Sequence, residues 1–313
     1  MALPPYRTIT LLIHAGAGSG TGSRFAPQVS AGVQELFATA EIEVIETKSK
    51  EHIESVGLAT AADLVICLSG DGSVHTLAQA LMRRPQSERP TLAVIPVGSG
   101  NDYARTLGIP LDPLKALAEL PNCVPIEADV GRVIADDATD DEAVYFLETM
   151  SFGVDAAVAL KTEELRQSTK TRGFRLYTRA AVDAILHELT EHTVQMRIAD
   201  QTITLDILIL AVQNGPTYGS GYRVAPRASI TDGILDICAL SGIRKPTALY
   251  YLTRMKNGSH EKLKGISLYR SSRLDLEFTE QLPIQCDGER VLGKRFAIEV
   301  VPAALTVLAK LER

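Results

Sequence analysis

The sequence predicts an α/β protein of two domains, with an N-terminal three-layer α/β domain built on a parallel sheet and a C-terminal antiparallel β-sandwich-like domain. Short apolar segments alternate with helical patterns over residues 1–124, as in the β-α-β units of a parallel sheet. From residue 125 onward, β-rich segments separated by turns replace that alternation. The 313 residues, of which 45% are hydrophobic, are enough to bury a core in each domain.

The first domain is expected to alternate strands with helices, with a further helix after each of two glycine turns. Pro110 and Pro121 follow the last two helical patterns and end them. The strands are expected at residues 8–13, 42–46, 64–68 and 92–96. The other helices are expected at residues 27–38, 53–62 and 113–120.

The second domain is expected to consist mostly of strands, interrupted by helices. An acidic segment at residues 136–142 is expected to form the exposed tip of a hairpin. The strands are expected at residues 144–150, 194–198, 203–212, 234–240 and 274–278. The helices are expected at residues 173–191 and 246–256.

Composition and charge exclude several classes of protein. The net charge of −6 argues against binding to nucleic acid, whose phosphates are held by an excess of Lys and Arg. No apolar run approaches the roughly 20 residues that cross a bilayer, and the N-terminus leads directly into a strand without a signal-peptide core. We therefore expect a cytoplasmic protein. The four scattered cysteines are expected to be reduced and packed.

Two glycine turns, residues 69–73 and 98–102, each follow a predicted strand and precede a predicted helix. Glycine lets the backbone approach a bulky anion, and the N–H groups at a helix start favour negative charge. A single turn of this kind is most simply a tight connection, but the pair could hold a polyphosphate. A third glycine-rich turn, residues 14–20, either contacts phosphate or only connects a strand with a helix.

The two turns resemble the GGDGT and GTxNDxAR motifs of the diacylglycerol kinase catalytic-domain family. This family includes bacterial soluble lipid kinases, sphingosine kinases and ceramide kinases. More distantly, the first turn resembles those of NAD kinases and phosphofructokinases. The resemblance continues through residues 151–155, 214–216 and 286–289, so that it covers nearly the whole chain.

The resemblance implies an ATP-dependent lipid kinase that transfers the γ-phosphate of ATP to a lipid hydroxyl, using Mg²⁺. Diacylglycerol, which would give phosphatidic acid, is the first choice of substrate, and a sphingoid base or another lipid alcohol is the alternative. An NAD kinase and a nucleotide-binding regulator without turnover are further hypotheses. The change to β-rich segments predicts domains at residues 1–124 and 125–295. The resemblance implies that terminal strands in residues 296–313, at 296–301 and 305–311, return to the first domain.

The family's motifs also indicate where the nucleotide would bind. Ser69 stands where the family has its first glycine and adds a Cβ, whereas Ser73 and Ser99 keep the hydroxyl of the family's threonines. A polar strand end explains Thr47 as well as contact with the nucleotide does. His75 is more simply a local hydrogen-bonding residue. The residues that the resemblance places at ATP are Thr47, Ser69, Gly70, Asp71, Gly72, Ser73, Val74, His75, Gly98, Ser99, Gly100 and Asn101.

Three acids are candidates for catalysis. A carboxylate beside bound phosphates would repel them unless a cation lay between, so we expect Asp71 to face Mg²⁺. The alternative is that Asp71 is a helix N-cap. Residues 286–289 read most simply as a hairpin turn. The resemblance makes Glu289 the general base that accepts the proton of the lipid hydroxyl, with Asp287 as a supporting or alternative acid.

Residues 228–236 resemble the family loop that holds a structural Mg²⁺ through one Asp and main-chain carbonyls. The matching ligands are Asp232 and the carbonyls of Ser229 and Ile234. Thr231 stands where the family has a second Asp. Without the resemblance, this segment reads as a plain Asp-Gly hairpin turn.

Basic residues gather at the two helical stretches of the second domain. Arg172, Arg175 and Arg179 fall on one helical face, and a second cluster brackets residues 246–256. These residues form either solvated faces or contacts to a lipid substrate at a membrane surface, which would make the protein peripheral at the inner membrane face. The sequence leaves open whether the protein forms a homodimer.

Overall fold

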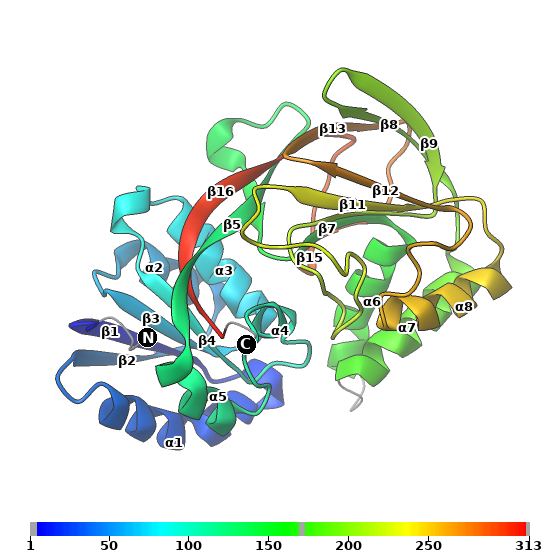
Figure 1. Ribbon diagram of the computed structural model, residues 1–313. Helices are drawn as coiled ribbons and strands as arrows, with labels where there is room; N and C mark the ends of the chain where they lie inside the picture. The colour runs from blue at the N-terminus through cyan, green and yellow to red at the C-terminus, as the bar shows by residue number, and fades with distance from the viewer. Residues whose placement is uncertain (1–4, 169–172, 311–313) are drawn as a thin grey trace. The chain divides into compact units, whose positions relative to one another are not determined.

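The computed structural model describes residues 5–168 and 173–310 of the chain. The chain divides into two compact units (Figure 1). Residues up to Ala128, together with those from Ala303 on, form unit 1, and Asp129–Pro302 form unit 2. None of the helices in the described ranges combines the length and the apolar composition that crossing a bilayer requires.

Unit 1 is a three-layer α/β structure around a parallel sheet. Its strands are β1 (Thr8–His14), β2 (Glu41–Thr47), β3 (Leu64–Ser69), β4 (Thr91–Pro96) and the end of β16 (Arg295–Ala309). The strand order is β2-β1-β3-β4-β16, and each neighbouring pair is parallel. All residues of β3 are buried, as expected for a central strand that is covered on both faces.

Helices cover both faces of this sheet (Figure 1). They are α1 (Thr21–Leu36), α2 (Lys50–Ala59), α3 (Asp71–Met82), α4 (Asp102–Thr106) and α5 (Pro113–Glu119). α1 packs with α5, and α2 packs with α3. The structure starts α1 before Pro27, the residue from which the sequence predicted it, because Gly20 in the left-handed region (φ 94°) caps the helix at Thr21.

Unit 2 contains an antiparallel sheet in which β12-β11-β10-β7-β14-β15 is the strand order. These strands are β7 (Thr149–Gly153), β10 (Ile209–Gln213), β11 (Leu235–Leu240), β12 (Ile266–Ser271), β14 (Ile284–Cys286) and β15 (Glu289–Arg290). A second layer of strands comprises β5 (Val124–Ala135), β6 (Val144–Phe146), β8 (His192–Ile198), β9 (Gln201–Ile207), β13 (Arg273–Phe278) and the first part of β16.

The two layers of unit 2 share one apolar core, which makes the unit sandwich-like. Phe152 of β7 stacks on Phe278 of β13 with ring centroids 5.0 Å apart, and its edge contact with Phe296 of β16 is 5.3 Å. All three rings are almost fully buried. Burying a side chain of this size stabilises the fold by roughly 1.5–3 kcal/mol, so this cluster is a main tie between the layers.

Helices α6 (Val154–Ser168), α7 (Gly173–His187) and α8 (Lys245–Lys256) also belong to unit 2. α6 packs against α7, and α7 packs against α8. The sequence predicted α7 and α8 but not α6. α6 begins immediately after the buried strand β7, at Val154, without a polar residue or proline between the two elements to signal a boundary.

Three strand predictions differ from the structure in their division. The strand predicted over 144–150 is divided into β6 and β7, which belong to different sheets. β16 is a single strand where the sequence predicted separate strands at 296–301 and 305–311, and it continues through Ala303, whose φ of 50° bends it without ending it. Conversely, the single strand predicted over 203–212 is divided into β9 and β10 around Leu208, whose N–H donates to the carbonyl of Leu240. The four cysteines are buried and free, as predicted.

Candidate active site

The two glycine turns touch each other through their backbones. They follow β3 and β4, which are neighbours with Ser69 opposite Pro96. A Cβ added to Gly98 would lie 2.5 Å from the Cα of Gly70, and one added to Gly70 would lie 2.8 Å from the Cα of Gly98. Because real Cβ atoms essentially never approach so closely, both positions require glycine to let the turns meet.

The Asp71 carboxylate fastens the first turn to the second. It accepts the N–H of Asn101 at 2.6 Å and that of Tyr103 at 3.3 Å, and so satisfies donors at the start of α4. Asn101 itself has a left-handed backbone (φ 57°), and its side chain bonds both the N–H and the carbonyl of Gly98 at 2.9 Å. Asp71 therefore caps the neighbouring helix rather than its own, an arrangement that the sequence did not predict.

Gly72 lies at the exposed edge of this pair of turns. A Cβ built on Gly72 would meet no atom within 4 Å, so packing within the protein does not require glycine here. It is the second residue of α3, in the first turn of the helix, where N–H groups lack an intrahelical acceptor. A small residue beside such N–H groups suits the close approach of an anion.

Other residues that the resemblance places at ATP are less accessible. Thr47 is fully buried, and its hydroxyl donates to the carbonyl of Ile13 and contacts Nδ1 of His14, both at 3.3 Å. Val74 and His75 face inward from α3 and are almost completely buried. Their side chains are therefore part of the packing beneath the turns.

Ser69 is fully buried at the end of β3, and its hydroxyl oxygen has no hydrogen-bond partner. Leaving a buried hydroxyl unpaired costs about 1–3 kcal/mol, so the serine is not explained by the packing around it. Ser73, Ser99 and Gly100 are partly exposed in or beside the two turns. The polar groups of these three residues are thus at the surface of the turns, whereas the hydroxyl of Ser69 lies beneath that surface.

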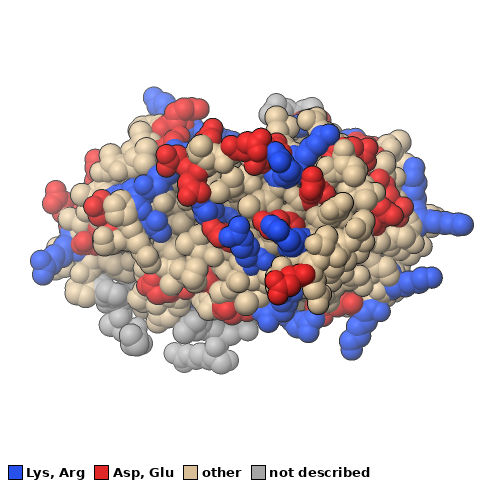
Figure 2. Space-filling model, turned by 90° about the horizontal axis from the view of Figure 1, so that it is seen from above, with Lys and Arg blue, Asp and Glu red and all other residues tan. Residues whose placement is uncertain are grey.

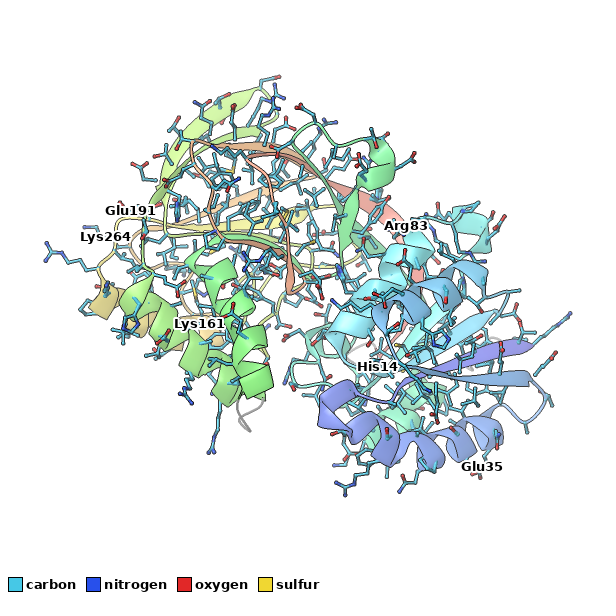
Figure 3. The ribbon with its side chains drawn as sticks, turned by 180° about the vertical axis from the view of Figure 1, so that it is seen from behind. His14, Glu35, Arg83, Lys161, Glu191 and Lys264 are labelled. Carbon is cyan, nitrogen blue, oxygen red and sulfur yellow. The ribbon has the colours of Figure 1, made fainter. Side chains whose placement is uncertain are left out.

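The third glycine-rich turn lies at the same edge of the sheet, after His14 at the end of β1 (Figure 3). Gly18 has φ of 59°, and a Cβ there would come within 2.0 Å of the carbonyl oxygen of Val97, next to the second glycine turn. The carboxyl ends of β1, β3 and β4 thus carry three glycine turns at one edge, which is where ligands bind in open parallel sheets.

The acidic turn between β14 and β15 in unit 2 uses its two acids differently. The Asp287 carboxylate accepts three successive N–H groups, from Leu147 at 2.7 Å, Glu148 at 3.1 Å and Thr149 at 2.9 Å. Asp287 also has a left-handed backbone (φ 46°). Glu289 begins β15 and is partly exposed. Asp287 therefore holds the turn against the neighbouring backbone, whereas Glu289 is the partly exposed acid of the turn.

A buried polar network supports this turn from within unit 2. Gln285 accepts the N–H of Gly288 at 2.6 Å and donates to the hydroxyl of Ser151 at 2.6 Å. Ser151 in turn hydrogen bonds to Asp155, which also accepts the hydroxyl of Tyr177 at 3.3 Å. Burial raises the pKa of Asp155, although these hydrogen bonds partly oppose the rise. The sequence pattern at residues 151–155 marked this segment, but gave no sign of the role of Gln285.

In the predicted structural metal loop, the one carboxylate of the expected ligand set already has partners within the chain. The Asp232 carboxylate accepts the N–H of Ile234 at 3.1 Å and is paired with the guanidinium of Arg270 at 2.5 Å. The Ser229 and Thr231 hydroxyls bond to each other at 3.1 Å. In the part of the chain that the structure describes, no group of three or more His, Cys, Asp or Glu side chains could hold a metal. The ligand set expected at Ser229, Asp232 and Ile234 therefore has its only carboxylate already engaged by an arginine.

A groove of about 580 Å³ runs between α6 and α7, with Lys161 of α6 beside α7 (Figure 3). Its lining combines apolar and charged side chains, namely Lys161, Leu165, Arg175, Thr178, Arg179, Val182, Asp183 and Leu186. Arg172, which the sequence places on the same face, lies outside the described residues. On the face seen in Figure 2, Lys and Arg are interspersed with Asp and Glu and form no broad patch of one sign.

Together, the parallel sheet with glycine turns at one edge and the β-sandwich-like unit with its acidic turn fit the class of kinases built on a nucleotide-binding domain. Comparison with known families identifies the kinase family. Residues 8–133 match the diacylglycerol kinase catalytic domain, and residues 148–309 match the YegS C-terminal NAD kinase beta sandwich-like domain. The chain belongs to the family of lipid kinases that combine these two domains.

One curated relative is similar in sequence, and two solved structures are similar in fold. A protein of Pectobacterium atrosepticum named probable lipid kinase YegS-like is 28% identical over 261 residues, which cover 82% of this chain and 81% of the relative. The crystal structure of a diacylglycerol kinase from Bacillus anthracis shares the fold with a TM-score of 0.76 at 21% identity, covering 97% of each chain. A yeast NADH kinase complexed with NADH shares it at a TM-score of 0.54 and 9% identity, covering 100% of this chain and 90% of that one.

Proposed function

We propose that this protein transfers the γ-phosphate of ATP to the hydroxyl of diacylglycerol, giving phosphatidic acid and ADP. The observation that carries the proposal is the pair of glycine turns after β3 and β4, held in contact by Asp71 and open at Gly72. Phosphoryl transfer depends mainly on positioning and charge neutralisation, and a rigid pair of turns beside a helix N-terminus supplies both for a polyphosphate. The similarity to named lipid kinases supports the choice of a lipid acceptor.

ATP would bring Mg²⁺ with it, and Asp71 is the residue that we propose to face this cation. A carboxylate has about four lone-pair sites, so acceptance of the N–H groups of Asn101 and Tyr103 is compatible with metal ligation. The metal would neutralise the charge that develops on the phosphates. Gly70, Gly72, Gly98 and Asn101 would keep the backbone close to them.

Glu289 is the proposed general base. The hydroxyl oxygen of the lipid forms a bond to the γ-phosphorus, the bond from that phosphorus to the bridging oxygen breaks, and ADP leaves. Glu289 takes the proton from the hydroxyl. The assignment to Glu289 is supported by the engagement of Asp287 with three backbone N–H groups, which makes Asp287 a positioning residue.

The groove between α6 and α7 is the proposed contact with the membrane. Its lining combines Leu165, Val182 and Leu186 with Arg175 and Arg179, a combination typical of surfaces that meet anionic lipid. We propose that the protein is cytoplasmic and docks peripherally on the inner membrane face, where its water-insoluble substrate lies.

The test is phosphate transfer from labelled ATP to diacylglycerol, monoacylglycerol, sphingosine and ceramide in mixed micelles, with NAD as a soluble acceptor. Labelled phosphatidic acid as the main product is the expected result. Preferred labelling of sphingosine would reassign the substrate within the same chemistry, and labelling of NAD would favour an NAD kinase. ATP binding without transfer to any acceptor, even in a single turnover, would indicate a regulator.

A further inference from the structure

The loop at residues 229–234 in unit 2 is held by charged side chains on both sides. On one side, Asp129 of β5 accepts the N–H of Gly233 at 2.7 Å, and the Asp129 N–H donates to the carbonyl of Ile230 at 2.6 Å. On the other side, Arg270 reaches the loop from β12. Groups of the chain itself thus hold the loop at three points.

Arg270 is placed by the register of the sheet. It lies directly opposite Asp236 in the antiparallel pair β11–β12. Its guanidinium contacts two carboxylates at once, with Nη2 2.5 Å from Oδ2 of Asp232 and Nε 3.2 Å from Oδ1 of Asp236. The arginine therefore links the loop to the strand that follows it.

The Asp236 carboxylate needs a nearby positive charge. The Asp236 side chain is only 14% exposed, and its Oδ2 is buried without a hydrogen-bond partner. Burying a carboxylate is costly unless it is paired. A guanidinium offers five donors in a planar fork and bridges carboxylates well, whereas Mg²⁺ demands six oxygens near 2.0–2.1 Å in an octahedron. The partners of Asp232 are the N–H of Ile234 and the guanidinium of Arg270, which match the first description.

We propose that Arg270 is the fixed cation of this loop and stands in for the structural Mg²⁺ that the family resemblance implies, so that unit 2 folds without a divalent metal. The guanidinium supplies the positive charge that a bound ion would supply, but it is covalently part of the chain. This inference does not depend on the lipid substrate or on turnover.

The test compares melting temperatures of the full chain, without nucleotide, in EDTA and in millimolar Mg²⁺. The wild type is expected to melt at the same temperature in both. Arg270→Gln is expected to melt roughly 2–4 °C lower in EDTA, and Mg²⁺ is expected to recover part of the loss, because Asp232 and Asp236 are then left without their shared cation. Arg273→Gln, an exposed neighbour on β13 whose nearest charged contact is 3.9 Å away, is the matched control and should not respond.

Three results would overturn the proposal. A wild type that EDTA destabilises would show that a metal occupies the loop. An Arg270→Gln variant as stable as the wild type would show that the arginine is not needed. A loss of stability that Mg²⁺ leaves unchanged would show that Arg270 acts by packing and not by charge. If Arg270→Gln fails to fold, the wild-type comparison still decides the question, and Asp232→Asn supplies a milder loss of the same ion pair.

Discussion

At the scale of single residues, the acids of the proposed site combine positioning with charge. Asp71 receives the backbone N–H groups of Asn101 and Tyr103, and Asp287 receives three successive N–H groups at the start of β7. Both are therefore expected to affect folding as well as any reaction. Glu289 differs because it begins a short strand and is partly exposed. Stability and turnover measured on the same variants separate these roles.

Asp71→Asn is expected to reduce Mg-ATP-dependent turnover by about 10²-fold or more, since the amide keeps the shape and loses the charge that would face the cation. The asparagine oxygen still accepts one of the two N–H groups, so the variant should remain folded. Initial rates and thermal unfolding, measured side by side, check both statements. Turnover near that of the wild type would refute the role of Asp71.

Glu289→Gln is expected to lower kcat on the order of 10²–10⁴-fold while the KM for ATP changes little, because a base is removed and the glycine turns stay intact. Steady-state kinetics with saturating lipid provide the measurement. An unchanged kcat would transfer the role to water or to another acid.

Asp287→Asn is expected to act mainly on stability. Its amide group can no longer accept all three N–H groups, and a buried unpaired donor costs about 1–3 kcal/mol. Chemical denaturation should show this loss in the free energy of unfolding. A variant with full stability and no activity would instead place Asp287 in the chemistry.

At the scale of elements, two variants of the glycine turns separate the effect of packing within the protein from that of ligand approach. Gly98→Ala is expected to destabilise unit 1 by about 1–3 kcal/mol, because its Cβ would fall 2.5 Å from the Cα of Gly70. Gly72→Ala is the matched variant, with no atom within 4 Å of its Cβ. It should be as stable as the wild type, or more stable by about 0.5–1 kcal/mol, and yet have a raised KM for ATP. An unaltered KM would mean that phosphate does not approach Gly72.

The sequence predicted the elements whose signals are local, and missed contacts that depend on pairing distant segments. The glycine turns and the strands of unit 1 carry their own patterns of apolar and small residues. The bond from Asn101 to Asp71 and those from Leu147 and Thr149 to Asp287 join residues far apart in the chain. Arg270 was missed for the same reason, since only the β11–β12 register brings it opposite Asp236.

At the scale of the whole molecule, an acidic protein must reach a lipid surface. Its net charge of −6 makes long-range attraction to anionic membranes unfavourable, so any docking depends on local basic residues. Arg175 and Arg179 are exposed along the α6–α7 groove. Each basic residue near such a surface contributes about 1 kcal/mol, and salt screens the contribution.

The double variant Arg175→Glu and Arg179→Glu is expected to sediment less with vesicles that contain anionic lipid, and added salt should weaken wild-type binding. A double variant at exposed arginines elsewhere in unit 2, Arg197→Glu and Arg273→Glu, makes the same change in net charge and serves as the control. Equal binding by the three proteins would leave the groove as an ordinary solvated face.

β16 also affects the order in which the protein can fold during synthesis. Its last residues lie beside β4 in the sheet of unit 1, and Arg89 donates to the carbonyl of Ala304 across 215 positions of the chain. All of unit 2 lies between these two segments. A ribosome therefore releases the whole of unit 2 before the sheet of unit 1 receives its final strand. Until then β4 keeps an open edge, which other unfinished chains could pair with.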